Sequence, residues 1–82
     1  MDMSQAEKEY ETMLLEIIEE EREKLENVIS TIAKERQERY RKAFEKICEI
    51  EVVEDRAFTV IAFVSELTKT LRALEELLRD DE

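Results

Sequence analysis

The chain contains no glycine and no proline, so nothing in its covalent structure ends a helix. From Ser4 to Ile50, apolar residues recur at steps of three and four, as one face of an α-helix requires. The side chains between them are mostly charged. The apolar positions are Ala6, Tyr10, Met13, Leu14, Ile17, Ile18, Leu25, Val28, Ile29, Ile32, Ala33, Tyr40, Ala43, Phe44 and Ile47. This pattern predicts an all-α protein with a helix over about 4–50.

One segment of this helix is a candidate break. Residues 28–31 and Ile32 are mostly β-branched, and such residues are poor helix formers. The continuous apolar stripe favours a helical hairpin with a long first helix. Packing favours a break at 28–31, which gives a three-helix bundle of nearly equal arms. Both architectures form a single helical domain over residues 1–82, and we expect the unbroken first helix.

The second half of the chain begins with a connection predicted at about 51–55. Asp55 is placed to cap a helix over about 56–79. A heptad runs through this helix, with Ala57, Val60, Val64, Leu67, Leu71, Leu74 and Leu78 in its two apolar positions. The alternative is a β-hairpin with strands near 47–53 and 57–64. The absence of a turn-forming Gly or Asn argues against that hairpin.

Composition limits how a chain of 82 residues is stabilised. A monomer of this size buries only about 60–65% of the surface that its unfolded chain exposes. A single cysteine, Cys48, with no histidine offers neither a disulfide nor a zinc site. We therefore expect association with itself or with a larger protein, and no cofactor or metal. The absence of a long apolar run predicts no membrane contact and a cytoplasmic location. The dense Glu, Lys and Arg content is typical of a thermophile.

The first turns of the second helix are apolar on nearly all sides, which is more than a single helix pair requires. This excess predicts a docking surface for a larger protein. Its candidate residues are Phe58, Ile61, Phe63 and Val64. The alternative is that these side chains belong to the core.

A basic segment interrupts an otherwise acidic chain. Residues 27–46 carry six basic and three acidic side chains, within a protein of net charge −10. The candidate nucleic-acid contacts in this segment are Arg36, Arg39, Tyr40, Arg41, Lys42 and Lys46. Because the total charge repels phosphates, DNA contact is expected only as part of a complex. The alternative is a helix surface that forms ion pairs with acidic helices.

Catalytic groups are scarce. Nucleophilic catalysis needs a base beside Ser, Thr or Cys, and no histidine is present. Glu19, Glu20 and Glu23 form an EExxE element that resembles the MazG-like nucleotide pyrophosphatases, and Glu35 and Glu38 stand in an ExxE where that family has ExxD. The resemblance implies Mg²⁺-dependent hydrolysis, which is the least favoured alternative.

As a whole, the chain resembles the small acidic helical subunits of archaeal replication assemblies. Its size, its acidic composition and its Glu-rich helices at 16–26 and 73–82 are similar to those of the small binding subunit of the crenarchaeal family-B replicative DNA polymerase. The resemblance implies a non-catalytic accessory subunit that supports polymerase activity or heat stability. A homo-oligomeric coiled-coil scaffold or regulator is the alternative.

Overall fold

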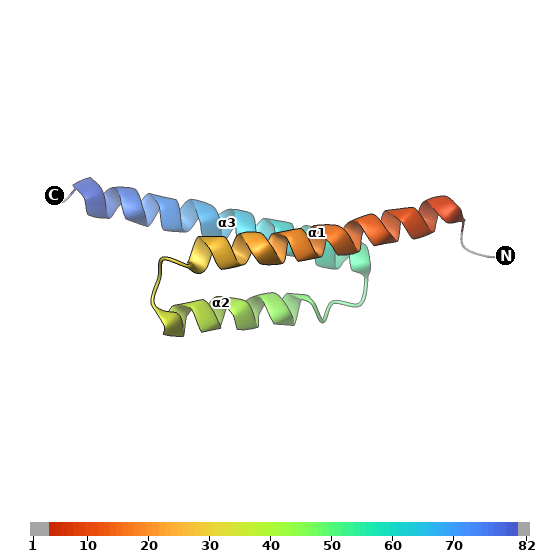
Figure 1. Ribbon diagram of the computed structural model, residues 1–82, viewed down its shortest axis with the longest axis horizontal. Coiled ribbons are helices and arrows are strands. Elements are labelled where there is room, and N and C mark those ends of the chain that lie inside the picture. Colours follow the sequence, from red (N-terminus) through yellow and green to blue (C-terminus); the bar gives the residue numbers. More distant parts are fainter. Residues whose placement is uncertain (1–3, 81–82) are drawn as a thin grey trace.

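The structure is a computed structural model that describes residues 4–80. It contains α1 (Gln5–Ile29), α2 (Lys34–Ile47) and α3 (Val53–Asp80). The helices α1 and α3 lie side by side and run in the same direction, and α2 runs in the opposite direction along one side of the pair (Figure 1). The protein is all-α, as predicted, and it has the three-helix arrangement.

The helix α1 is capped at its N-terminus by Ser4. Ser4 has extended backbone angles, and its Oγ accepts a hydrogen bond of 3.1 Å from the amide of Glu7. The buried face of α1 is formed by Leu14, Ile18, Leu25 and Ile29. Between Ile18 and Leu25, the buried face of α1 contains one charged residue, Glu21. Its carboxylate forms an ion pair with Lys24 Nζ at 3.0 Å.

The favoured prediction of one helix through residue 50 is wrong, and the alternative, a break near 28–31, is confirmed. The chain leaves the helix after Ile29 and re-enters it at Lys34, with Ala33 extended between them. Ser30 Oγ donates to the carbonyl of Asn27, so the hydroxyl bonds the helix's own backbone at the point where the helix ends. The β-branched residues around Ser30 add little helical preference to oppose this. Folding back lets α2 cover the core that an unbroken helix would leave open.

The second connection covers residues 48–52, earlier than predicted. Arg56 holds it in place, because its Nε donates to the carbonyl of Ile50 at 2.8 Å. Asp55 is therefore inside the first turn of α3 and does not cap it. Residues 4–80 contain no strand, so the alternative β-hairpin is also wrong.

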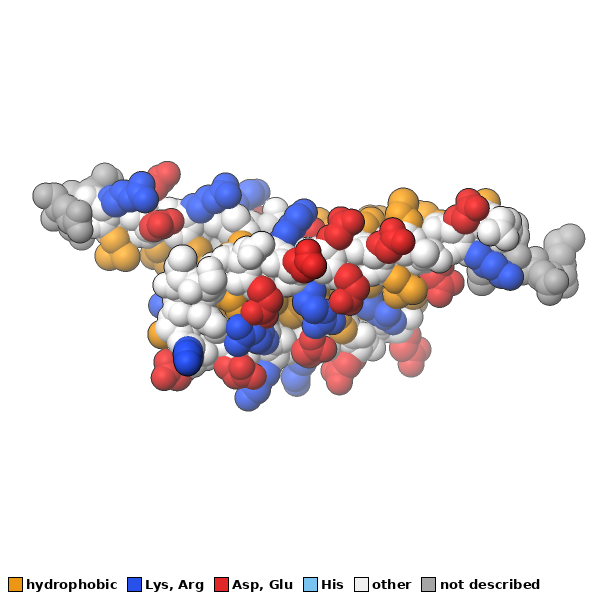
Figure 2. Space-filling model, in the orientation of Figure 1, with side chains coloured by type: hydrophobic (Ala, Val, Ile, Leu, Met, Phe, Trp, Pro, Cys, Tyr) orange, Lys and Arg blue, Asp and Glu red, His pale blue; other side chains and the backbone are white. Residues whose placement is uncertain are grey.

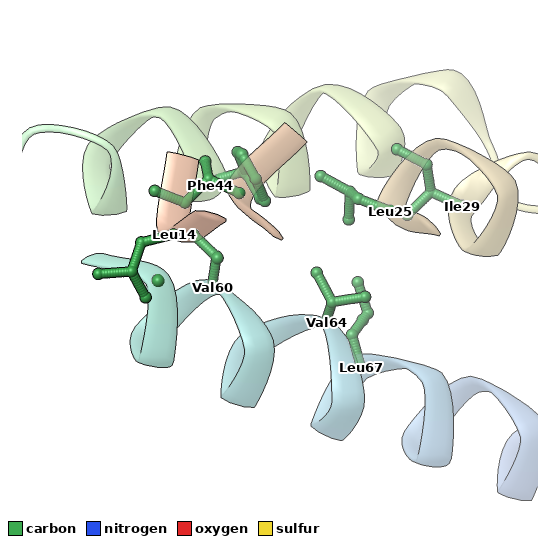
Figure 3. Close-up of a cluster of buried hydrophobic side chains, with 9 residues drawn as sticks. Leu14, Leu25, Ile29, Phe44, Val60, Val64 and Leu67 are labelled. Carbon is green, nitrogen blue, oxygen red and sulfur yellow. The ribbon is translucent and has the colours of Figure 1, made fainter. Parts of the chain in front are cut away.

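The core lies along one seam between the three helices. Val64 and Leu67 of α3 face Leu25 and Ile29 of α1 (Figure 3). At the other end of the seam, Phe44 of α2 points toward Val60, and Leu14 lies beside the same turn of α3. Phe44 is the buried side chain of α2, with 1% of its surface exposed. The heptad predicted for α3 is the face that forms this seam.

The two parallel helices are offset along their axes. The N-terminal turns of α1 extend past the start of α3, and the C-terminal turns of α3 extend past the end of α1 (Figure 1). The hydrogen bond of 2.6 Å from Tyr10 Oη to Glu54 marks the register. The offset gives a molecule of 64 × 21 × 15 Å. No helix within residues 4–80 has both the length and the apolarity needed to cross a membrane.

Candidate functional site

An apolar patch lies on the outer face of α3. It consists of Phe58, Ile61 and Ala62, spaced i, i+3 and i+4, and we call it the outer patch. The core positions Ala57 and Val60 are on the opposite side of the same turns. Phe58 has 56% of its surface exposed, although phenylalanine is among the residue types most often buried.

Two of the four predicted docking residues do not belong to this surface. Val64 is 2% exposed and sits in the core, so no partner reaches it while the helices stay packed. Phe63 is half-buried against the core and lines a shallow apolar groove with Ile47 and Leu67. The structure therefore assigns the core alternative to Val64, and it leaves Phe58 and Ile61 exposed.

The predicted basic contacts divide in a similar way. Four of them recur along α2 at i, i+3, i+6 and i+10, and their side chains are exposed: Arg36, Arg39, Lys42 and Lys46. We call these residues the basic stripe. None of them forms a salt bridge with another residue of the described range 4–80. The stripe is free to meet an external anion.

The other two predicted contacts, Arg41 and Tyr40, interact with the rest of the protein. The Nε and Nη2 atoms of Arg41 donate to the two carboxylate oxygens of Glu26, each at 2.7 Å, which joins α2 to α1. This pairing lowers the pKa of the Glu26 carboxyl. Its stabilising effect is present above the ordinary carboxyl pKa and is lost as the pH falls through the lowered value. Tyr40 is half-buried against the core.

A second link between α1 and α2 centres on Arg22. Its guanidinium forms an ion pair with Glu45 and lies 4.8 Å from the centroid of the Phe44 ring. Its Nη2 is also 3.7 Å from Cys48 Sγ. Burial raises the pKa of the Cys48 thiol, which disfavours the reactive thiolate form. No local pattern predicts this cluster, because its members meet only when α2 folds back on α1.

Replacing Arg22 with alanine is expected to lower the free energy of unfolding by about 1–2 kcal/mol, since the cation–π contact and the ion pair are lost together. Arg22→Lys keeps the charge but not the planar fork, so it should recover only part of this loss. Urea unfolding followed by circular dichroism measures both variants. Equal stability of Arg22→Ala and wild type would show that the cluster contributes nothing.

The predicted acidic elements do not form a metal site. Glu19 forms an ion pair with Arg22 at 3.4 Å, and Glu35 and Glu38 lie on the exposed side of α2. Over residues 4–80, no three carboxylate or thiol groups gather closely enough to hold a metal ion.

The arrangement thus offers two external surfaces, an apolar one on α3 and a basic one on α2, and both suit binding to a macromolecule. Comparisons with protein-family models, with curated proteins and with solved structures found no match for this chain.

Proposed function

We propose that the protein is a non-catalytic accessory subunit that docks on a larger protein through the outer patch. The observation that carries this proposal is the exposure of Phe58 on a helix face that turns away from the core. An apolar stripe at i, i+3 and i+4 is the form in which a helix enters a groove of a partner. Exposed aromatic side chains are also the usual anchors of protein interfaces.

The first partner to test is a replicative DNA polymerase, because the chain resembles a small polymerase subunit in size, charge and helical character. Such a partner gives the basic stripe a role. With a net charge of −10, the free protein repels DNA at long range. Held on DNA by a partner, Arg39 and Lys42 meet phosphates at short range, where the local positive charge of α2 outweighs the distant acidic groups.

Affinity capture from a lysate of the source cells tests the docking. We expect wild type to retain a stoichiometric large protein and Phe58→Glu to lose it, because a carboxylate at the centre of an apolar interface is buried without a partner. Leu15→Glu is the matched control, since Leu15 is an exposed apolar residue on α1, outside the patch. That variant should retain the partner.

Circular dichroism of the isolated variants separates binding from folding. Phe58→Glu should remain as helical as wild type, because the side chain already faces solvent. Recovery of wild type without any large protein, or retention of the same partner by Phe58→Glu, would contradict the proposal. Mass spectrometry of the eluate identifies the partner and decides between a polymerase and another assembly.

A further inference from the structure

The apolar seam of α3 continues beyond the helix that covers it. Leu71, Leu74 and Leu78 keep the heptad register of the core positions, but α1 ends at Ile29. Leu74 is consequently 44% exposed, whereas Leu67, one heptad earlier, is 8% exposed. Apolar side chains are visible along the edge of this tail that faces the start of α2 (Figure 2). We call residues 71–80 the α3 tail.

A groove of about 530 Å³ lies at the base of the tail. Val28 and Ile32 form one wall, at the end of α1 and in the turn that follows it. The leucines of the tail form the other wall. The lining is mainly apolar, which suits the leucine-bearing face of a further helix.

The rim of the groove carries complementary charges. Arg36 and Arg72 line it, and within the described residues neither forms a salt bridge. Glu75 lines it as well, and its one ion pair is a long contact of 3.8 Å with the exposed Arg79. One chain therefore contributes both a groove with free guanidinium groups and a leucine-bearing tail with a carboxylate.

The amount of exposed surface also fits an interface. The protein exposes 6476 Å², whereas a compact monomer of 9.8 kDa exposes about 5200 Å². The excess of about 1300 Å² belongs to the whole offset molecule, and it is larger than the roughly 800 Å² that a stable interface buries per partner.

We infer that the α3 tail and its groove form a dimer interface with a second copy of this chain. The two tails cross antiparallel about a two-fold axis, and Leu74 of each copy packs beside Leu78 of the other. Arg36 of each copy then faces Glu75 of the other, so every rim contact occurs twice. The repulsion between two acidic copies is screened over about 8 Å at physiological salt, whereas these contacts are at short range.

A second copy fits better than an unrelated protein because the groove and its complement are on the same chain. In a two-fold interface, each patch must match itself after rotation. The α3 tail and its groove can match themselves in this way. The tail leucines line the groove that receives the tail of the other copy, and the rim carries both positive and negative side chains. The outer patch, formed by Phe58, Ile61 and Ala62, carries no such pair of opposite charges, so its composition does not favour a second copy over another apolar partner.

Sedimentation equilibrium across the micromolar range tests the dimer. Wild type should be a dimer, and Leu74→Glu should weaken the dissociation constant by at least about a hundredfold, because two buried leucines become carboxylates. Leu15→Glu is the matched control, since Leu15 is 43% exposed and Leu74 44%. It should remain a dimer. A monomeric wild type, a dimeric Leu74→Glu, or a trimer would overturn the inference.

A charge-exchange experiment tests the two-fold pairing directly. Arg36→Glu alone and Glu75→Arg alone should each dimerise more weakly than wild type, because each places like charges across the interface. Mixed together, they should form a heterodimer in preference to either homodimer, since both rim pairs then join opposite charges, one with inverted sign and one as in wild type. Native mass spectrometry resolves the three species. A statistical mixture of dimers would show that Arg36 and Glu75 do not meet.

The dimer and the docking on a larger protein have separate tests. Phe58→Glu should keep the dimer and lose the larger partner. Leu74→Glu should lose the dimer and keep that partner. Loss of the dimer in Phe58→Glu would place the interface at the outer patch and overturn the inference about the tail.

Discussion

Replacing Phe44 with alanine is expected to lower the free energy of unfolding by about 3–4 kcal/mol. Phe44 is 1% exposed and is the side chain that anchors α2 in the core. Its loss removes the apolar contact with α3 and also the ring over which Arg22 lies. For a domain of this size, the loss is a large part of the total stability.

Phe58→Ala is the matched control for Phe44→Ala, because the chemical change is the same at an exposed site. Its effect should stay within about 0.5 kcal/mol. Guanidinium unfolding followed at 222 nm measures both. Hydrogen exchange of Phe44→Ala should show the amides of α2 losing protection before those of α1 and α3. Similar stability for the two variants would mean that α2 is not anchored through Phe44.

Local patterns in the sequence were sufficient to predict the composition of the seam. Apolar spacing placed Leu14, Ile18 and Leu25 on one face, and the heptad placed Val60 and Leu67 on another. Such patterns report which side of a helix is buried, and they do so because burial of apolar surface dominates folding. They do not report how far a helix extends once its apolar stripe continues through a turn.

The end of α1 and the bounds of the second connection were predicted less accurately than the seam, because local patterns do not report where a helix ends. The stripe passes through Ser30 without interruption, so periodicity favoured one helix. The energy that decides the break comes from covering the core with α2, which is a long-range effect. Asp55 likewise has the chemistry of a cap. The connection that ends before it is held by Arg56, through carbonyl contacts that no local pattern encodes.

The kinds of residue that form the two candidate surfaces were predicted, but the individual residues that belong to each surface were not. The basic segment was identified, yet the pairing of Arg41 with Glu26 joins residues of two helices and depends on the fold. The apolar excess of α3 was also identified. Because α3 is covered on one side only, that excess divides into core, at Val64, and exposed surface, at Phe58.

Replacing Val64 with glutamate is expected to unfold the protein at neutral pH, at a cost of more than about 4 kcal/mol, because the change removes a buried valine and places a carboxylate in the core. Circular dichroism should show the loss of helix, whereas Phe58→Glu stays helical. If Val64→Glu remained folded and lost only its partner, Val64 would belong to a docking surface.

The pH dependence of Val64→Glu identifies the charge as the cause. Burial raises the pKa of a carboxyl in the core above its unfolded value of about 4.3, so the folded state binds the proton more tightly. The destabilisation relative to wild type should therefore be largest above the raised pKa and shrink as the pH falls to the unfolded value. Val64→Gln has a similar shape and no titration, so its difference from wild type should not change with pH. Parallel behaviour of the two variants would mean that shape, and not charge, disrupts the core.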